Sequence, residues 1–92
     1  MRIRMYKVLI AEDEFLVRIG IKSTILESDL PLMVVGDTSN GLSAYDLFIQ
    51  KQPDIVITDI KMPGLNGIDL IRKIRSEDKG CAIIVISCLE DF

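Results

Sequence analysis

The chain has 92 residues and a mass of 10.3 kDa, and 49% of the residues are hydrophobic and 27% charged. This length and composition fit one small globular domain and exclude an intrinsically disordered chain. The net charge of −3 argues against a nucleic-acid surface, because binding to phosphates needs a concentrated excess of Lys and Arg. We therefore expect these residues to make no direct contact with nucleic acid.

Membrane and export segments are not expected either. No apolar stretch approaches the roughly 20 residues that a membrane span requires. The first apolar run, residues 8–11, ends at once in acidic residues, unlike a signal peptide. These features predict a cytoplasmic protein without membrane contact, in which Cys81 and Cys88 stay reduced.

Alternating patterns along the chain predict its strands and helices. Short, nearly continuous apolar runs are typical of strands covered on both faces, and they predict strands at residues 6–11, 32–36, 54–59 and 82–86. Apolar residues near helical spacing predict three helices between the strands. The first covers about residues 14–27. The second begins at the Asn40-Gly41 cap and ends at Gln52-Pro53, and the third begins at the Asn66 cap and ends at Lys79-Gly80.

Two of these helices carry more specific expectations. In the first helix the apolar residues near helical spacing are Phe15, Leu16, Ile19 and Leu26, and acidic residues are expected in its first turn. In the third helix the face turned toward the sheet is expected to be Ile68, Leu70, Ile71 and Ile74.

The order of the elements predicts the fold class. Right-handed crossovers between four strands and three alternating helices require a largely parallel sheet. We therefore predict an α/β, flavodoxin-like doubly wound sheet with strand order 2-1-3-4. Such folds bind ligands at the carboxyl ends of the strands where the order reverses, here between the first and third strands.

Acidic residues stand at that point of the predicted sheet. Glu12 and Asp13 end the first strand and Asp59 ends the third, so their carboxylates should converge. Like charges about 4 Å apart repel by about 4 kcal/mol at an effective dielectric of 20, so the cluster needs a counter-ion or a raised pKa. All-oxygen ligands with room for water suit Mg²⁺, which predicts a magnesium site.

Phosphoryl chemistry follows from this prediction. A metal held by carboxylates can also bind phosphoryl oxygens, and Asp59 is the candidate nucleophile because a carboxylate can form an acyl phosphate. Ser87, at the end of the next strand, is a candidate for contact with the phosphoryl group. Taken singly, these acids fit helix-dipole or turn roles and Ser87 fits an ordinary strand end. Their shared position at one sheet edge favours a site.

Three segments carry a family resemblance, and they read VLIAEDE at residues 8–14, DIVITDIKMPGLNG at 54–67 and IVIS at 84–87. Together they resemble the receiver domain of two-component response regulators, over nearly the whole chain from Tyr6. The resemblance implies that Asp59 is phosphorylated and that Asp13 holds Mg²⁺ directly, with Glu12 acting through water. It also implies that the backbone carbonyl of Lys61 completes the protein ligands and that Ser87 turns toward the phosphoryl group as a switch.

The resemblance also sets expectations about domains and partners. It identifies residues 1–92 as a single partial receiver domain, with 1–5 as an N-terminal extension and an end at the start of the family's fourth helix. The family's fourth helix, its fifth strand with a Lys, and its fifth helix are not in this sequence. The resemblance implies two partners, a sensor histidine kinase and an output domain outside this chain of the arabinose-regulator helix-turn-helix type. We also expect the apolar edge formed by Ile83, Ile84, Val85 and Ile86 to drive self-association.

Three functions are compatible with these residues. The first is a phosphoacceptor signalling module for transcription regulation, a substrate of its kinase more than an enzyme. The second is a Mg²⁺-dependent phosphohydrolase with an aspartyl nucleophile, which would usually need a second carboxylate close after Asp59, where the chain has Ile60-Lys61-Met62. The third is a pseudo-receiver used only for binding.

Overall fold

The structure, a computed structural model, describes residues 4–86. Its strands and helices alternate along the chain in the order β1 (Tyr6–Ala11), α1 (Phe15–Glu27), β2 (Leu32–Thr38), α2 (Gly41–Lys51), β3 (Ile55–Asp59), α3 (Gly67–Glu77) and β4 (Ala82–Ile86). The four strands are all parallel and lie in the order β2-β1-β3-β4. The predicted α/β fold and its strand order are therefore confirmed.

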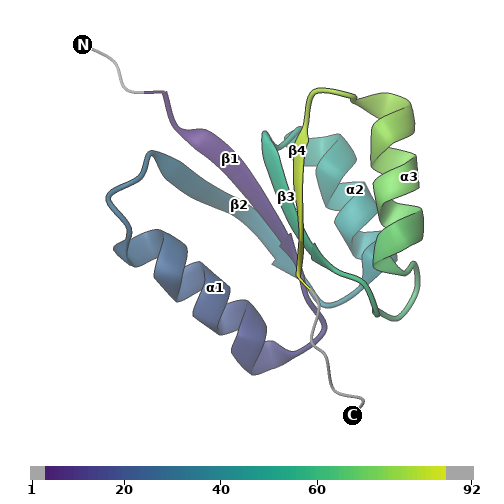
Figure 1. The fold of residues 1–92 in the computed structure, drawn as a ribbon, viewed down its shortest axis with the longest axis horizontal. Helices are drawn as coiled ribbons and strands as arrows, with labels where there is room; N and C mark the ends of the chain where they lie inside the picture. The colour runs from purple at the N-terminus through teal and green to yellow at the C-terminus, as the bar shows by residue number, and fades with distance from the viewer. Residues whose placement is uncertain (1–3, 87–92) are drawn as a thin grey trace.

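The helices cover both faces of the sheet, with α1 on one side and α2 and α3 on the other (Figure 1). The central strand β1 is buried on both sides because successive side chains of a strand point to opposite faces. Val8 and Ile10 pack with Ile25 of α1, while Leu9 and Ala11 pack with the cluster that includes Phe48 of α2 and Leu70 and Ile74 of α3.

Side-chain caps begin two of the three helices. The side chain of Asn40 accepts hydrogen bonds from the backbone N–H groups of Leu42 and Ser43, and the side chain of Asn66 accepts one from Asp69. The expected caps of α2 and α3 are therefore confirmed. α1 begins after Glu14 without a side-chain cap and has no acidic residue in its first turn, so the expected acidic first turn is wrong.

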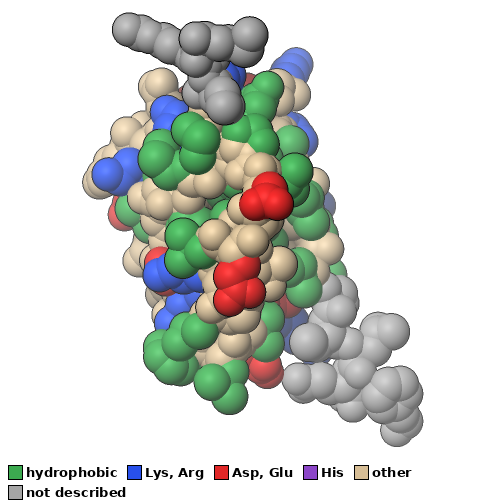
Figure 2. Space-filling model, turned by 90° about the vertical axis from the view of Figure 1, so that its left-hand side faces the viewer, with side chains coloured by type: hydrophobic (Ala, Val, Ile, Leu, Met, Phe, Trp, Pro, Cys, Tyr) green, Lys and Arg blue, Asp and Glu red, His purple; other side chains and the backbone are tan. Residues whose placement is uncertain are grey.

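The buried face of α1 also differs from the spacing of its most apolar residues. The buried residue of α1 is Ile25, whereas the residues near helical spacing, Phe15, Leu16, Ile19 and Leu26, are all exposed, Leu16 at 80%. The helix carries apolar residues around most of its circumference, so spacing does not determine which face packs on the sheet. Figure 2, which views the molecule from the side where α1 lies in Figure 1, shows hydrophobic side chains interspersed with charged ones on this surface.

The expectation for α3 is partly correct. Leu70 and Ile74 are fully buried, and Ile71 is half-buried. Ile68 is 44% exposed, so its expected place on the inner face is wrong. Ile68 lies in the first turn of α3, just after the Asn66 cap.

Strand β4 lies at an edge of this sheet. It pairs with β3 from Ile55↔Ala82 to Asp59↔Ile86, and Ile84 and Val85 are exposed. The self-association expected from this edge stays a prediction. None of the helices within residues 4–86 has the length and apolar character needed to cross a bilayer.

Candidate functional site

Three carboxylates meet at the carboxyl edge of β1 and β3. The register pairs Ala11 of β1 with Thr58 of β3, so the next residues, Glu12 and Asp59, end neighbouring strands at the same level. Glu12, Asp13 and Asp59 each place a carboxylate oxygen within 4.8 Å of the other two. The convergence expected from the sequence is therefore present.

Glu12 is the buried member of this acidic cluster. Only 4% of its surface is exposed, and its Oε1 atom accepts a 3.0 Å hydrogen bond from the backbone N–H of Glu14. Burial raises the pKa of Glu12 above its usual value, and the negative charges of Asp59 and Asp13 raise it further, against the lowering effect of the Glu14 hydrogen bond. The site therefore favours either a proton or a cation beside these oxygens.

The repulsion within the cluster is large enough to matter for binding. At the observed limit of 4.8 Å, two unit charges repel by about 3.5 kcal/mol at an effective dielectric of 20. Asp13 is exposed and Asp59 is half-buried, so water reaches the open side of the cluster and reduces this value there. A divalent cation that replaces repulsion by attraction is favoured.

The donor set fits Mg²⁺. All three side chains offer carboxylate oxygens, which hard cations prefer, and the exposed side leaves positions for water and a further oxygen ligand. Glu12 and Asp13 follow a rigid central strand, and Asp59 ends its neighbour, so the ligands stand on fixed elements. A bound Mg²⁺ would neutralise the cluster and attract phosphoryl oxygens.

Asp59 itself is held by its backbone neighbours. Its Oδ1 atom accepts a 2.7 Å hydrogen bond from the N–H of Ile60, and its carbonyl accepts a 2.9 Å bond from the hydroxyl of buried Thr58. The half-buried carboxylate is thus oriented at the end of β3 while remaining within reach of a molecule from solvent.

The loop after β3 packs closely against Asp59. The N–H of Gly67 donates a 2.7 Å hydrogen bond to the carbonyl of Ile60, and a Cβ atom at Gly67 would collide with the carbonyl oxygen of Asp59. The same loop is joined to α2, because the N–H of Gly41 donates to the carbonyl of Pro63. Glycine at position 67 is therefore required by close approach.

The expected roles of two further site residues, Lys61 and Ser87, are not tested by this geometry. Lys61 lies in the loop two residues after Asp59 with its side chain exposed, and its expected role as a carbonyl ligand stays a prediction. Ser87 lies outside the described residues, so its expected contact with a phosphoryl group also stays a prediction.

Arg18, at the edge of the site, was not expected from the sequence. Arg18 of α1 donates from Nη1 to the carbonyl oxygen of Glu12 at 2.7 Å, and its Nε lies 3.3 Å from Oδ1 of Asp37 on β2. The sequence pattern that could have indicated its role is a basic residue near the start of a helix that follows an acidic segment. Its partners are a backbone carbonyl and a residue of another strand, which only the fold brings together.

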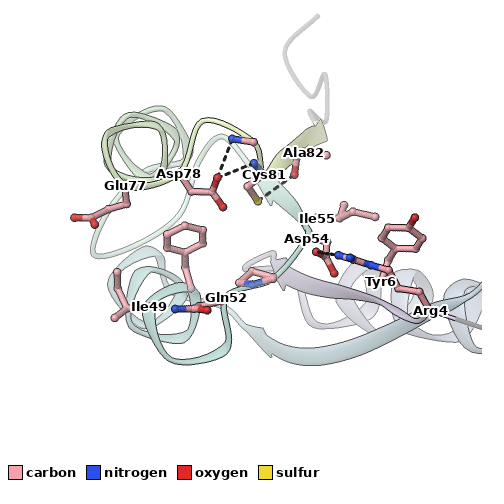
Figure 3. Close-up of a pocket in the computed structure, with 13 residues that line it drawn as sticks. Arg4, Tyr6, Ile49, Gln52, Asp54, Ile55, Glu77, Asp78, Cys81 and Ala82 are labelled. Carbon is pink, nitrogen blue, oxygen red and sulfur yellow. Dashed lines mark hydrogen bonds and ion pairs between the residues drawn. The ribbon is translucent and has the colours of Figure 1, made fainter.

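A hollow of different character lies at the other end of the strands. It encloses about 1040 Å³ between the carboxyl ends of α2 and α3 and the beginnings of β3 and β4 (Figure 3). Several of its polar side chains are already paired, since Arg4 binds Asp54 at 2.7 Å and Asp78 accepts from the N–H groups of Gly80 and Cys81. The acidic cluster, at the carboxyl edge, is therefore the stronger candidate for chemistry.

Comparison with known proteins agrees with this geometry. The family model described as the response regulator receiver domain matches residues 8–91, and the chain therefore belongs to that family. Receiver domains are signalling domains rather than classical enzymes.

Similar curated proteins are regulators of transcription by name. The chain is 40% identical over 88 residues to the uncharacterized transcriptional regulatory protein YesN of Bacillus subtilis, covering 96% of this chain and 24% of YesN. It is also 40% identical over 88 residues to the transcriptional regulatory protein HptR of Staphylococcus aureus, covering 96% of this chain and 34% of HptR. The chain thus spans about a quarter to a third of the length of these relatives.

Solved structures show the same fold. The receiver domain of AraT, a response regulator from Geobacillus stearothermophilus, is 32% identical with a TM-score of 0.85, covering 90% of this chain and 64% of that one. A DNA-binding response regulator of the LuxR family from Staphylococcus aureus is 30% identical with a TM-score of 0.83, covering 95% of this chain and 72% of that one.

Proposed function

We propose that this receiver domain accepts a phosphoryl group on Asp59 from a sensor histidine kinase, with Mg²⁺ bound by the acidic cluster. The observation that carries the proposal is the convergence of Glu12, Asp13 and Asp59 within 4.8 Å at the carboxyl edge of β1 and β3. Glu12, Asp13 and Asp59 would hold the magnesium ion, which would neutralise charge on the incoming phosphoryl oxygens.

The chemistry assigned to this chain is a single displacement at phosphorus. A carboxylate oxygen of Asp59 attacks the phosphorus atom of a phosphohistidine, the P–N bond breaks, and the imidazole leaves with its electron pair and takes a proton from water. The product is an acyl phosphate on Asp59. The N–H of Ile60, which donates to Oδ1, orients the carboxylate for this attack.

The phosphoryl group would then be read by other parts of a longer protein. We propose that the modified site shifts a two-state equilibrium and that a DNA-binding output domain outside this chain responds. The names of YesN and HptR as transcriptional regulatory proteins support such an output. Within this proposal the exchange takes place in the cytoplasm, with Ser87 and the carbonyl of Lys61 as the further phosphoryl and metal contacts.

Intact mass measurement tests the proposal. The chain is incubated with acetyl phosphate in Mg²⁺, with the chelator EDTA as a parallel condition, and compared with its Asp59→Asn variant. The expected result is one added phosphoryl group that requires both Mg²⁺ and Asp59. An adduct of equal yield in the variant would overturn the assignment of Asp59, and fast donor hydrolysis without an adduct would favour a phosphohydrolase.

A further inference from the structure

One hydrogen bond and one ion pair of Arg18 join the acidic cluster to the adjacent edge of the sheet. The Nη1 atom of Arg18 donates to the carbonyl oxygen of Glu12 at 2.7 Å. The Nε atom of the same guanidinium faces Oδ1 of Asp37 at 3.3 Å. One planar side chain of α1 therefore links the residue that ends β1 to a residue of β2, and we name this arrangement the Arg18 bridge.

The bridge acts on Glu12, a cluster residue whose backbone is also paired with the sheet. The N–H of Glu12 donates to the carbonyl of Thr38 at 2.9 Å, which continues the pairing of β1 with β2. The carboxylate of Glu12 accepts from the N–H of Glu14. With its carbonyl bound by Arg18, Glu12 is fixed through its N–H, its carbonyl and its side chain.

The interactions of the Arg18 bridge are stronger than those of a surface ion pair, because its side chains are partly buried. The side chain of Arg18 is 16% exposed and that of Asp37 is 28% exposed, so water screens their interaction only in part. Lys22, one turn further along α1, places its Nζ atom 2.8 Å from Oδ2 of Asp37. Asp37 is thus held from both sides and presents a fixed carboxylate to the guanidinium.

We propose that Arg18 is a positioning residue that holds the backbone of Glu12, and through it the carboxylates of Glu12 and Asp13, in the arrangement that binds Mg²⁺. This inference rests on the proposed magnesium site. This role requires a guanidinium group, because its separate N–H groups can bind a backbone carbonyl and a carboxylate in two directions at once. A lysine ammonium on a flexible side chain cannot hold both partners in this geometry.

Three variants separate this role from simple charge or stability effects. Arg18→Met removes the bridge, and Arg18→Lys keeps the positive charge without the fork. Lys22→Met is the matched control, because it removes a cation that binds the same Asp37 and leaves the bond to the Glu12 carbonyl in place. The dissociation constant for Mg²⁺ is measured by calorimetry for the whole chain, and thermal unfolding without metal reports folding.

The Mg²⁺ dissociation constant should rise about tenfold in Arg18→Met and in Arg18→Lys. Removing a residue that orients a metal ligand typically weakens metal binding by about this factor. Lys22→Met should stay within about twofold of wild type, as for an exposed ion pair. Wild-type affinity in Arg18→Lys would overturn the inference in favour of charge alone. An equal loss in Lys22→Met would overturn it in favour of the Asp37 ion pairs.

A metal-free readout separates failure of this inference from failure of the proposed function. Hydrogen exchange of the Glu14 amide, which donates to the Glu12 carboxylate, should become about tenfold faster in Arg18→Lys without Mg²⁺, corresponding to about 1.4 kcal/mol of lost protection. Unchanged exchange would overturn the bridge while leaving the magnesium site standing. Absence of Mg²⁺ binding in the wild type would overturn the proposed site, and with it any effect of Arg18 on metal affinity.

Discussion

Replacing Asp59 by Asn should stabilise the metal-free protein, because it removes one of three negative charges that the fold brings together. The asparagine has nearly the same shape, and its Oδ1 atom can still accept the hydrogen bond from Ile60. Asp59 lies within 4.8 Å of both Glu12 and Asp13, and one such pair repels by about 3.5 kcal/mol at an effective dielectric of 20. Screening at the exposed side of the cluster reduces this value, so the expected gain is about 1 to 3 kcal/mol at low ionic strength.

Urea unfolding followed by circular dichroism measures this gain. Asp29→Asn serves as the charge-matched control, since Asp29 is an exposed acid in the connection between α1 and β2, at the opposite end of the strands. Free Mg²⁺ at about a hundred times its dissociation constant should stabilise wild type by about 2.7 kcal/mol, and Asp59→Asn by much less. Equal or lower metal-free stability of Asp59→Asn, relative to the control, would refute the argument that these charges repel.

Three further changes test other parts of the account. Because the pKa of Glu12 is raised, its carboxyl group binds a proton more tightly in the metal-free native state than in the unfolded chain. The contribution of Glu12 to the free energy of unfolding therefore falls as the pH rises from about 4.5 through the native pKa. The Glu12→Gln variant should lack this fall when urea unfolding is measured across the same pH range. Asn40→Ala should cost about 1 kcal/mol in the same assay, because α2 loses its cap at Leu42 and Ser43, and an unchanged midpoint would contradict the capping role. Gly67→Ala should cost about 1 to 3 kcal/mol and lower the yield of phosphoryl adduct, since its methyl group displaces the Asp59 carbonyl; a wild-type melting curve and yield would argue against this close packing.

The sheet could be predicted from sequence because its strands are strongly marked. Residues 8–11 form an uninterrupted apolar run, and the structure buries all four on the central strand. Alternation of such runs with helical segments left the parallel 2-1-3-4 order as the expected arrangement. The meeting of Glu12 with Asp59 then followed from strand order alone, because parallel strands end at the same edge.

The parts that could not be predicted depend on how surfaces pack. On α1 the apolar residues surround the helix, and the sheet takes up Ile25 while leaving Leu16 exposed. The Arg18 bridge depends on a backbone carbonyl and on Asp37 of another strand, so no local pattern marks it. Local spacing thus predicts which segments form elements more reliably than which side of each element is covered.

Phosphorylation of Asp59 is tested by locating the phosphoryl group within the chain. After incubation with Mg²⁺ and acetyl phosphate, borohydride reduction converts a phosphoaspartate to homoserine, which tandem mass spectrometry of peptides can assign to one position. We expect homoserine at position 59, formed only when Mg²⁺ is present. Homoserine at another aspartate with Asp59 unmodified would contradict it.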